Sequence, residues 1–452
     1  MTTRRPARRR PVVLAALAVL FALLLSACTS AEQVVVTVTT TPGVAGSQPA
    51  QPTDAPTSDG QPTDAPTSDG QPADTGGAAA SDPNTPPPSR SLAAAIRITS
   101  KPAFGTKDVA PNEPITVTVF SGKIKDLTVT GDDGSTVNGT IGDDQATFAT
   151  TDRMSYGVTY TFAGTVVAPD NSTKKINGAV STIKPESTVQ ALIGLREGQS
   201  VGVGAPIIIT FLTAVTDKAA AQKALKVTTD KGEIEGSWGW VQDEDFLNSK
   251  SLQSQVHFRP KVYWPANTKV TVTADLAGVN LGSGWGREDL VRHFSVGRSL
   301  VLKADVSTKH LVVWKDGVIF KNYPVSYGRE SEPGRTTVSG VHIVQEKYPT
   351  FKMTNPQFGY YNLPEKYAIR INNNGEFIHH NEGVEKAGLL GKENVSHGCV
   401  NMGEADAKEL FDMVIYGDPV EVSGTTQQMS EKDAIYDWKY SWEDWKNLSA
   451  QG

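Results

Sequence analysis

Ser396-His397-Gly398-Cys399-Val400-Asn401 is the stretch that decides how this 452-residue chain is interpreted, because it sets a histidine and a glycine directly before a cysteine. The chain has only one other cysteine, Cys28, which follows an apolar run and the small residues Ser26 and Ala27. Exported proteins usually pair their cysteines in disulfides. If Cys28 carries a lipid, Cys399 has no partner, and a free thiol beside a histidine calls for a chemical explanation.

Residues 1–27 have the layout of an export signal. Five arginines and no acidic residue within residues 1–10 precede the almost wholly apolar residues 11–25. About 15 apolar residues fall short of the roughly 20 that a membrane-spanning helix needs, so we predict cleavage. Ser26 and Ala27 resemble the end of a bacterial lipoprotein signal, which would leave Cys28 first and acylated. The alternative is an ordinary signal peptide with an incidental cysteine.

Charge excludes one class of partner. The formal net charge is −6, and loss of the five signal arginines takes the mature chain to −11. We therefore expect no binding to nucleic acid and no electrostatic adherence to an anionic membrane. Lipid on Cys28 would then be the attachment, and we expect an extracytoplasmic protein on the outer face of the plasma membrane, in the cell envelope.

Composition and patterning divide the rest of the chain. Residues 28–90 are rich in Pro, Ser, Thr, Asp, Gly and Ala and duplicate the decapeptide 51–60 as 61–70, which predicts a disordered tether. Alternating apolar residues separated by turn sequences predict an antiparallel sandwich over 91–184 and a longer second copy over 185–298. Trp238 and Trp240 in the second copy are interpreted as core or interface residues rather than as a sugar-stacking site.

Residues 299–423 predict a mostly β unit with one main helix. Asp316-Gly317 lies between two apolar runs and predicts a hairpin. A helix is expected at roughly 404–416 and a closing strand at 419–422. The tail, 424–452, is expected to form a helix whose aromatic stripe packs back on the catalytic unit or its neighbour, with contact to glycan or membrane as the alternative. The residues of the stripe are Ile435, Trp438, Trp442 and Trp445.

A nucleophilic cysteine needs a nearby base, because a free thiol is only a few per cent thiolate at neutral pH. His397 lies two residues before Cys399, and His379 and His380 end the predicted strand 375–380. Neighbouring strand residues face opposite sides, so only one of His379 and His380 can face the thiol. Gly398 leaves the backbone free to approach a substrate carbonyl, and the N–H groups of Gly398 and Cys399 are candidates for stabilising an oxyanion.

The motif 396–401, with a strand histidine about 20 residues earlier, resembles the signature of L,D-transpeptidases, enzymes that cross-link peptidoglycan stem peptides. The tether, two immunoglobulin-like domains and the tail are similar to actinobacterial members. The resemblance implies a mostly β chain with two immunoglobulin-like sandwiches before the catalytic domain. It also implies a Cys399 thioester, 3→3 cross-links between diaminopimelate residues, no cofactor or metal, and covalent inhibition by β-lactams of the carbapenem type.

Carried over by position, the resemblance makes Cys399 the nucleophile, His379 the base and His397 a residue of the acceptor side, with Gly398 at the oxyanion. Ser396, Asn401 and His380 would belong to the pocket, and His380 stands where the family often has a serine. The lid before the histidine also looks shorter than in related enzymes. Its candidate substrate-binding residues are Met353, Phe358, Tyr360 and Tyr361.

Other functions use the same residues. His379, His380, His397 and Cys399 include favoured zinc ligands, although adjacent strand residues point apart. Cys399 could instead be an inert buried thiol in a binding or scaffold protein. Among enzymes, thioester hydrolysis and attachment of another protein to peptidoglycan remain open, because the nucleophile does not encode the acceptor.

Overall fold

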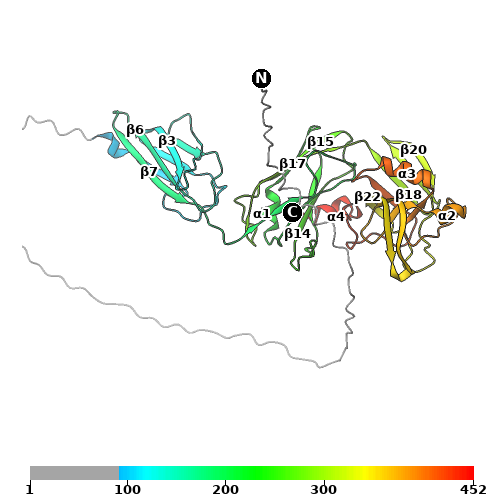
Figure 1. Ribbon diagram of the computed structural model, residues 1–452. Coiled ribbons are helices and arrows are strands. Elements are labelled where there is room, and N and C mark those ends of the chain that lie inside the picture. Colours follow the sequence, from blue (N-terminus) through cyan, green and yellow to red (C-terminus); the bar gives the residue numbers. More distant parts are fainter. Residues whose placement is uncertain (1–90, 452) are drawn as a thin grey trace, which may run out of the picture. The chain divides into compact units, whose positions relative to one another are not determined.

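A computed structural model describes residues 91–451, and β-strands dominate them (Figure 1). The signal, Cys28 and the tether lie outside the described residues. Within residues 91–451, no helix is long and apolar enough to cross a membrane.

The first domain is a sandwich of two antiparallel sheets, ordered β1-β2-β5-β4 and β3-β6-β7. Alternate residues of the strands point inward and form a core shared by the two sheets. This core includes Val117 and Val119 of one sheet and Tyr160 and Phe162 of the other. The sandwich predicted from this pattern is confirmed. Its elements are η1 (Leu92–Ala95), β1 (Arg97–Lys101), β2 (Thr116–Phe120), β3 (Lys123–Gly131), β4 (Gly139–Ile141), β5 (Thr147–Thr150), β6 (Thr159–Val167) and β7 (Thr173–Ser181).

The second domain has sheets ordered β10-β17-β15-β12 and β13-β14-β11-β9, with β16 pairing β8 at one end. Trp238 and Trp240 are each 7% exposed within its core, as expected. Its elements are β8 (Thr188–Val189), β9 (Ala191–Ile193), β10 (Gln199–Val201), β11 (Ile207–Phe211), α1 (Lys218–Lys223), β12 (Leu225–Thr229), β13 (Gly236–Trp240), β14 (Ser254–Pro260), β15 (Thr268–Ala274), β16 (Trp285–Gly286) and β17 (Leu290–Val296).

The third domain packs a five-stranded sheet, β20-β19-β18-β26-β21, against a four-stranded sheet, β22-β23-β24-β25, and their apolar residues form one core. The Asp316-Gly317 hairpin, the helix and the closing strand are confirmed, although the helix ends at Met413. Its elements are β18 (Leu300–Asp305), β19 (His310–Lys315), β20 (Val318–Pro324), β21 (Gly340–Ile343), β22 (Glu346–Asn355), η2 (Pro356–Phe358), β23 (Tyr360–Arg370), β24 (Phe377–His380), α2 (Glu382–Lys386), β25 (Val400–Met402), α3 (Glu404–Met413) and β26 (Pro419–Ser423).

The tail is not the single helix expected from its aromatic spacing. It forms two short helices, η3 (Asp437–Lys439) and α4 (Trp442–Lys446). Ile435 has φ +53°, a left-handed value that a continuing helix does not contain. The preceding turn is held by the catalytic domain, where Asn373 Oδ1 accepts a hydrogen bond from the Ala434 N–H at 2.9 Å. Tertiary contacts therefore override the local helical pattern.

The aromatic residues of the tail pack on the second sandwich. Trp445 is fully buried and donates its indole N–H to the Ser237 carbonyl of β13 at 3.0 Å. The Arg259 guanidinium of β14 lies 4.6 Å from the ring centroid of Trp438 and 5.1 Å from that of Trp445. The predicted packing of the tail on the neighbouring domain is confirmed.

The catalytic and second domains also join directly. The N–H groups of Gly202 and Gly204 donate to the carbonyls of Tyr416 and Gly417, both at 2.8 Å. A Cβ on Gly202 would lie 2.3 Å from the Asp418 backbone nitrogen, so this approach requires glycine. These contacts fix the catalytic domain to the sandwich that precedes it.

Candidate active site

Strand pairing sets the cysteine against the histidines. β24 and β25 are parallel neighbours, with His379 opposite Asn401 and Ile378 opposite Val400. The chain leaves β24 through α2 and a loop, and returns with Cys399 immediately before β25. The sequence predicted this return from its glycines, and a short helix occupies the start of the loop.

His379 and His380 face opposite sides of β24, and His379 is the one beside the thiol. His379 and Cys399 line the same cavity, and the interaction with Cys399 is one of the causes that raise the pKa of His379. His380 turns away and pairs through Nε2 with Glu385 Oε2 at 2.9 Å. The same carboxylate oxygen accepts from the Glu404 N–H at 3.2 Å, at the start of α3. His380 therefore helps to fix α2 against α3, and its side chain takes no part in the pair with Cys399.

The backbone of His380 orients the imidazole of His379. The Nδ1–H of His379 donates to the His380 carbonyl at 2.7 Å, which leaves Nε2 for the sulfur. Glu365 of β23 adds a carboxylate oxygen 3.4 Å from Nδ1. Burial lowers the pKa of His379, but hydrogen bonds to Cys399 and Glu365 outweigh it and raise the pKa to about 10. This environment favours an imidazolium beside the sulfur, the charge that a thiolate needs.

Ser396 and Thr337 hold the turn that carries Cys399. Ser396 Oγ donates to the Cys399 carbonyl at 2.5 Å and accepts from the Gly398 N–H at 3.1 Å. Thr337 Oγ1 donates to the Gly398 carbonyl at 2.8 Å. Gly398 has φ +119°, a backbone conformation that glycine adopts without strain. The motif glycine thus serves the shape of this turn.

The oxyanion expectation is only partly met. Because the Gly398 N–H is bonded to Ser396, it does not point at a substrate carbonyl in this structure. Within residues 91–451, the Cys399 N–H makes no hydrogen bond and remains the available donor. The Cys399 thiol donates a hydrogen bond of 3.6 Å to the Gly375 carbonyl, just before β24.

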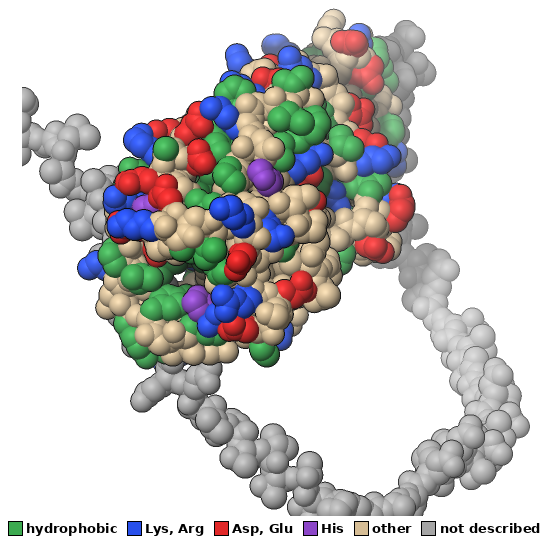
Figure 2. Space-filling view, turned by 90° about the vertical axis from the view of Figure 1, so that its right-hand side faces the viewer, with side chains coloured by type: hydrophobic (Ala, Val, Ile, Leu, Met, Phe, Trp, Pro, Cys, Tyr) green, Lys and Arg blue, Asp and Glu red, His purple; other side chains and the backbone are tan. Residues whose placement is uncertain are grey.

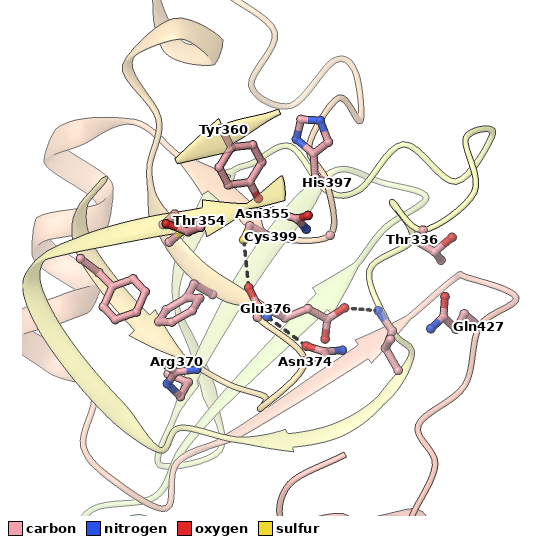
Figure 3. A pocket seen from close by; sticks show the side chains of 17 residues that line it. Thr336, Thr354, Asn355, Tyr360, Arg370, Asn374, Glu376, His397, Cys399 and Gln427 are labelled. Atoms are coloured by element: carbon pink, nitrogen blue, oxygen red, sulfur yellow. Dashed lines mark hydrogen bonds between the residues drawn. The ribbon is translucent and has the colours of Figure 1, made fainter. Parts of the chain in front are cut away.

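Two cavities meet at Cys399. The larger, of about 330 Å³, is lined by Glu376, Asn374, Tyr360 and His397 among others (Figure 3). The smaller, of about 230 Å³, contains His379 and Glu365. His379 lines only the smaller cavity, whereas Cys399 lines both. The sulfur is therefore accessible from two sides, with the imidazole on one of them.

The lid is the β22–β23 hairpin, and it brings together three of its four predicted residues. Met353 and Tyr360 line both cavities, and the Phe358 ring lies 4.6 Å from the His397 ring. Tyr361 is 64% exposed and lines neither cavity, because it points away on the alternate face of β23.

His397 lies between the two cavities and lines each of them. Burial and then the nearby Arg335 guanidinium lower its pKa, which favours a neutral ring. Its ring packs against the aromatic residues of the lid. Asn401 is buried in the smaller cavity, as is Ser396, and the Asn401 backbone pairs with Ser326.

Several polar residues of the site were not predicted from the sequence, and Glu365, Glu376 and Thr337 are among them. Glu365 and Glu376 line the cavities, and Thr337 holds Gly398. Burial raises the pKa of Glu376 to about 7, although hydrogen bonds from Val338, Asn374 and Asn372 oppose the shift. The only available signal was acidic residues within otherwise apolar or aromatic strand segments, which is too common to single them out.

Among the described residues, no group of three or more His, Cys, Asp or Glu side chains is arranged to hold a metal ion. On the face that Figure 2 shows, Lys and Arg side chains are interspersed with Asp and Glu.

Comparison with known proteins places these features in a family. A family described as the L,D-transpeptidase catalytic domain matches residues 299–422, and one described as a bacterial Ig domain matches residues 106–280. L,D-transpeptidase 5 of Mycobacterium tuberculosis is 39% identical over 367 residues, which cover 81% of this chain and 78% of that protein. L,D-transpeptidase 2 of the same species is 30% identical over 365 residues, covering 78% of this chain and 85% of that protein.

Among solved structures, L,D-transpeptidase 3 from Mycobacterium tuberculosis, in complex with a faropenem-derived adduct, is 28% identical, with a TM-score of 0.41. The match covers 52% of this chain and 98% of that one. The two relatives above match most of this chain and of their own length, and the catalytic match includes both Cys399 and His379. The chain therefore belongs to the L,D-transpeptidase family.

Proposed function

We propose that this protein forms 3→3 cross-links in peptidoglycan through a thioester on Cys399. The observation that carries the proposal is the position of Cys399 where two cavities meet, with His379 in one of them and its Nδ1–H held by a backbone carbonyl. Acyl transfer between two peptides needs such a nucleophile with space on both sides. Water hydrolysis alone would not need a second cavity.

In the first half-reaction, the Cys399 sulfur attacks the carbonyl between the L-centre of diaminopimelate and the terminal D-alanine. The C–S bond forms, the C–N bond breaks, and the His379 imidazolium gives its proton to the departing amine. The Cys399 N–H is the available donor for the oxyanion of the tetrahedral intermediate.

The position of His379 indicates which part of the substrates each cavity binds. His379 protonates the leaving amine and later deprotonates the incoming one, so both amines must occupy its side of the sulfur in turn. His379 lines only the smaller cavity. We therefore assign the acyl part of the donor stem to the larger cavity, and the leaving D-alanine and the acceptor amine to the smaller one.

We further propose that lipid on Cys28 holds the enzyme at the outer face of the plasma membrane. The layout of residues 1–27 and the composition of residues 28–90 support an exported chain on a long tether. The peptidoglycan substrate lies in that compartment, and the reaction uses no nucleotide that would confine it to the cytoplasm.

Intact mass spectrometry tests the nucleophile. Wild type, exposed separately to a carbapenem and to a tetrapeptide stem, should gain one acyl adduct, because a strained lactam and the stem each offer a carbonyl to the sulfur. Cys399→Ala should gain none. Persistence of the adduct in Cys399→Ala would overturn the assignment.

The histidine pair supplies a matched control. His379→Ala should slow acylation by at least about 100-fold, the usual contribution of a general base. His380→Ala should have a smaller effect on acylation, because the His380 side chain faces Glu385 and the backbone carbonyl survives the change. A greater loss in His380→Ala would mean that the base is misassigned. Fragmentation of the cross-linked product decides whether the new bond joins two third-position residues.

A further inference from the structure

Glu365 places a negative charge inside the smaller cavity. Its side chain is 12% exposed and lines that cavity with Cys399 and His379. Within residues 91–451, His379 is the only ionic partner within 4.0 Å of this carboxylate. A largely buried carboxylate without a Lys or Arg partner is costly unless something compensates it. The charge therefore calls for a role in the cavity.

The orientation of His379 does not account for the presence of the Glu365 carboxylate in the cavity. The Nδ1–H of His379 already has a hydrogen bond of 2.7 Å to the His380 carbonyl, whereas Glu365 Oε2 is 3.4 Å away. The shorter bond is sufficient to set the tautomer. What the carboxylate adds is charge, directed both at the imidazole and at the cavity that opens beside the sulfur.

We propose that Glu365 binds the ammonium group of the acyl acceptor and orients it toward the Cys399 thioester, so that an amine rather than water takes the acyl group. The inference rests on the proposed function and extends it to how the acceptor is chosen. An amine of the diaminopimelate class is an ammonium near neutral pH, and a carboxylate is its complementary partner.

Proton transfer gives Glu365 a second effect. The ammonium must lose a proton before its lone pair can attack, and an ordinary imidazole, with a pKa near 6.5, is a weak acceptor for it. Glu365 is one of the two groups that raise the pKa of His379, the other being Cys399, whose charge is absent from the thioester. Glu365 therefore remains to support the basicity of His379 during the second half-reaction.

In the second half-reaction, the amine displaces the Cys399 thiolate from the acyl group. The C–N bond forms and the C–S bond breaks, and the amine gives up two protons in all. One stays on His379 as the partner of the released Cys399 thiolate, and the other goes to solvent. Both protons are thus accounted for without a transfer to Glu365.

The charged and titratable groups around His379 are few. Glu365 faces it from β23, and Cys399 faces it from the turn before β25. On the other face of β24, His380 is paired with Glu385 of α2. Among these groups, Glu365 alone combines contact with His379 and a place in the smaller cavity with Cys399.

The experiment compares Glu365→Gln with wild type after acylation. A tetrapeptide stem whose side-chain amine is acetylated serves as donor only, and an unmodified stem is added as acceptor. The ratio of cross-linked to hydrolysed product is measured against acceptor concentration and pH. Because the ratio is set after the thioester forms, it does not depend on the rate of acylation.

We expect the ratio to fall by roughly tenfold or more in Glu365→Gln, the loss of one charge-assisted hydrogen bond. The acceptor concentration needed for half-maximal cross-linking should rise. Glu365→Asp should restore part of the ratio. Glu382→Gln is the matched control, because Glu382 is an exposed acid of α2 paired with Lys386, and it should keep the wild-type ratio.

Hydroxylamine separates recognition of charge from a structural role, because it is uncharged near neutral pH. Its capture of the thioester should change far less in Glu365→Gln than capture by the stem ammonium. Equal losses for both acceptors, or an unchanged ratio in a Glu365→Gln protein that still acylates, would overturn the inference. If wild type acylates but forms no cross-link with the stem, the proposed function fails first and the inference with it.

Discussion

Replacing Trp445 by alanine tests whether the tail is an integral part of the second sandwich. The indole is fully buried, and its ring lies flat on Gly239, where a Cβ would stand 2.8 Å from the ring. A buried Trp→Ala change costs about 3–5 kcal/mol, and the lost hydrogen bond to the Ser237 carbonyl adds to the upper part of that range. We therefore expect the free energy of unfolding to fall by about 4 kcal/mol.

Trp442→Ala is the control for this measurement. Trp442 is half-buried, and the Arg259 guanidinium lies 5.6 Å from its ring centroid, so its loss should cost about 1 kcal/mol. Urea unfolding followed by circular dichroism is the assay, because fluorescence would change with the removed indoles, and the transition that contains the second sandwich is the one to compare. A cost for Trp445→Ala no greater than that for Trp442→Ala would refute the reasoning.

Two further predictions concern the site. Gly398→Ala should fold but acylate roughly tenfold or more slowly, because a φ of +119° strains an alanine by about 1–3 kcal/mol. Gly383→Ala in α2 is the control and should acylate at the wild-type rate, and stopped-flow acylation measures both variants. Glu376→Gln should remove a pH dependence of stability, because Glu376 has a pKa of about 7 in the folded wild type and near 4.5 in the unfolded chain. As the pH rises between these values, the free energy of unfolding of wild type should fall by about 3 kcal/mol relative to that of Glu376→Gln. A difference in unfolding free energy between the two proteins that stays constant with pH would contradict this.

Local patterns predicted much of the fold. Alternation gave the sandwich strands, Asp316-Gly317 gave its hairpin, and the family motif identified the segment with Cys399 and the strand with His379. Each of these signals depends on residues close together in sequence or on faces of a single element.

What could not be predicted depends on contacts between distant segments. The helical spacing of the tail is interrupted at Ile435 because a catalytic-domain asparagine holds the preceding turn. Glu365 reaches His379 only through the register of β23 with β24, which no local pattern specifies. No sequence pattern shows that Ser396 Oγ accepts the Gly398 N–H, which removes this donor from the oxyanion site.

The docking of the tail has a consequence for the order of folding. Trp445 and its partner Ser237 are 208 positions apart, and Asp437, fully buried, pairs with His257 at 2.8 Å across 180 positions. Contacts between such distant residues form late, and synthesis delivers the tail after the catalytic domain. Until then Arg259 lacks its aromatic partners. A nascent chain interrupted before residue 437 would therefore present an incomplete sandwich, the kind of surface by which proteases and chaperones detect unfinished proteins.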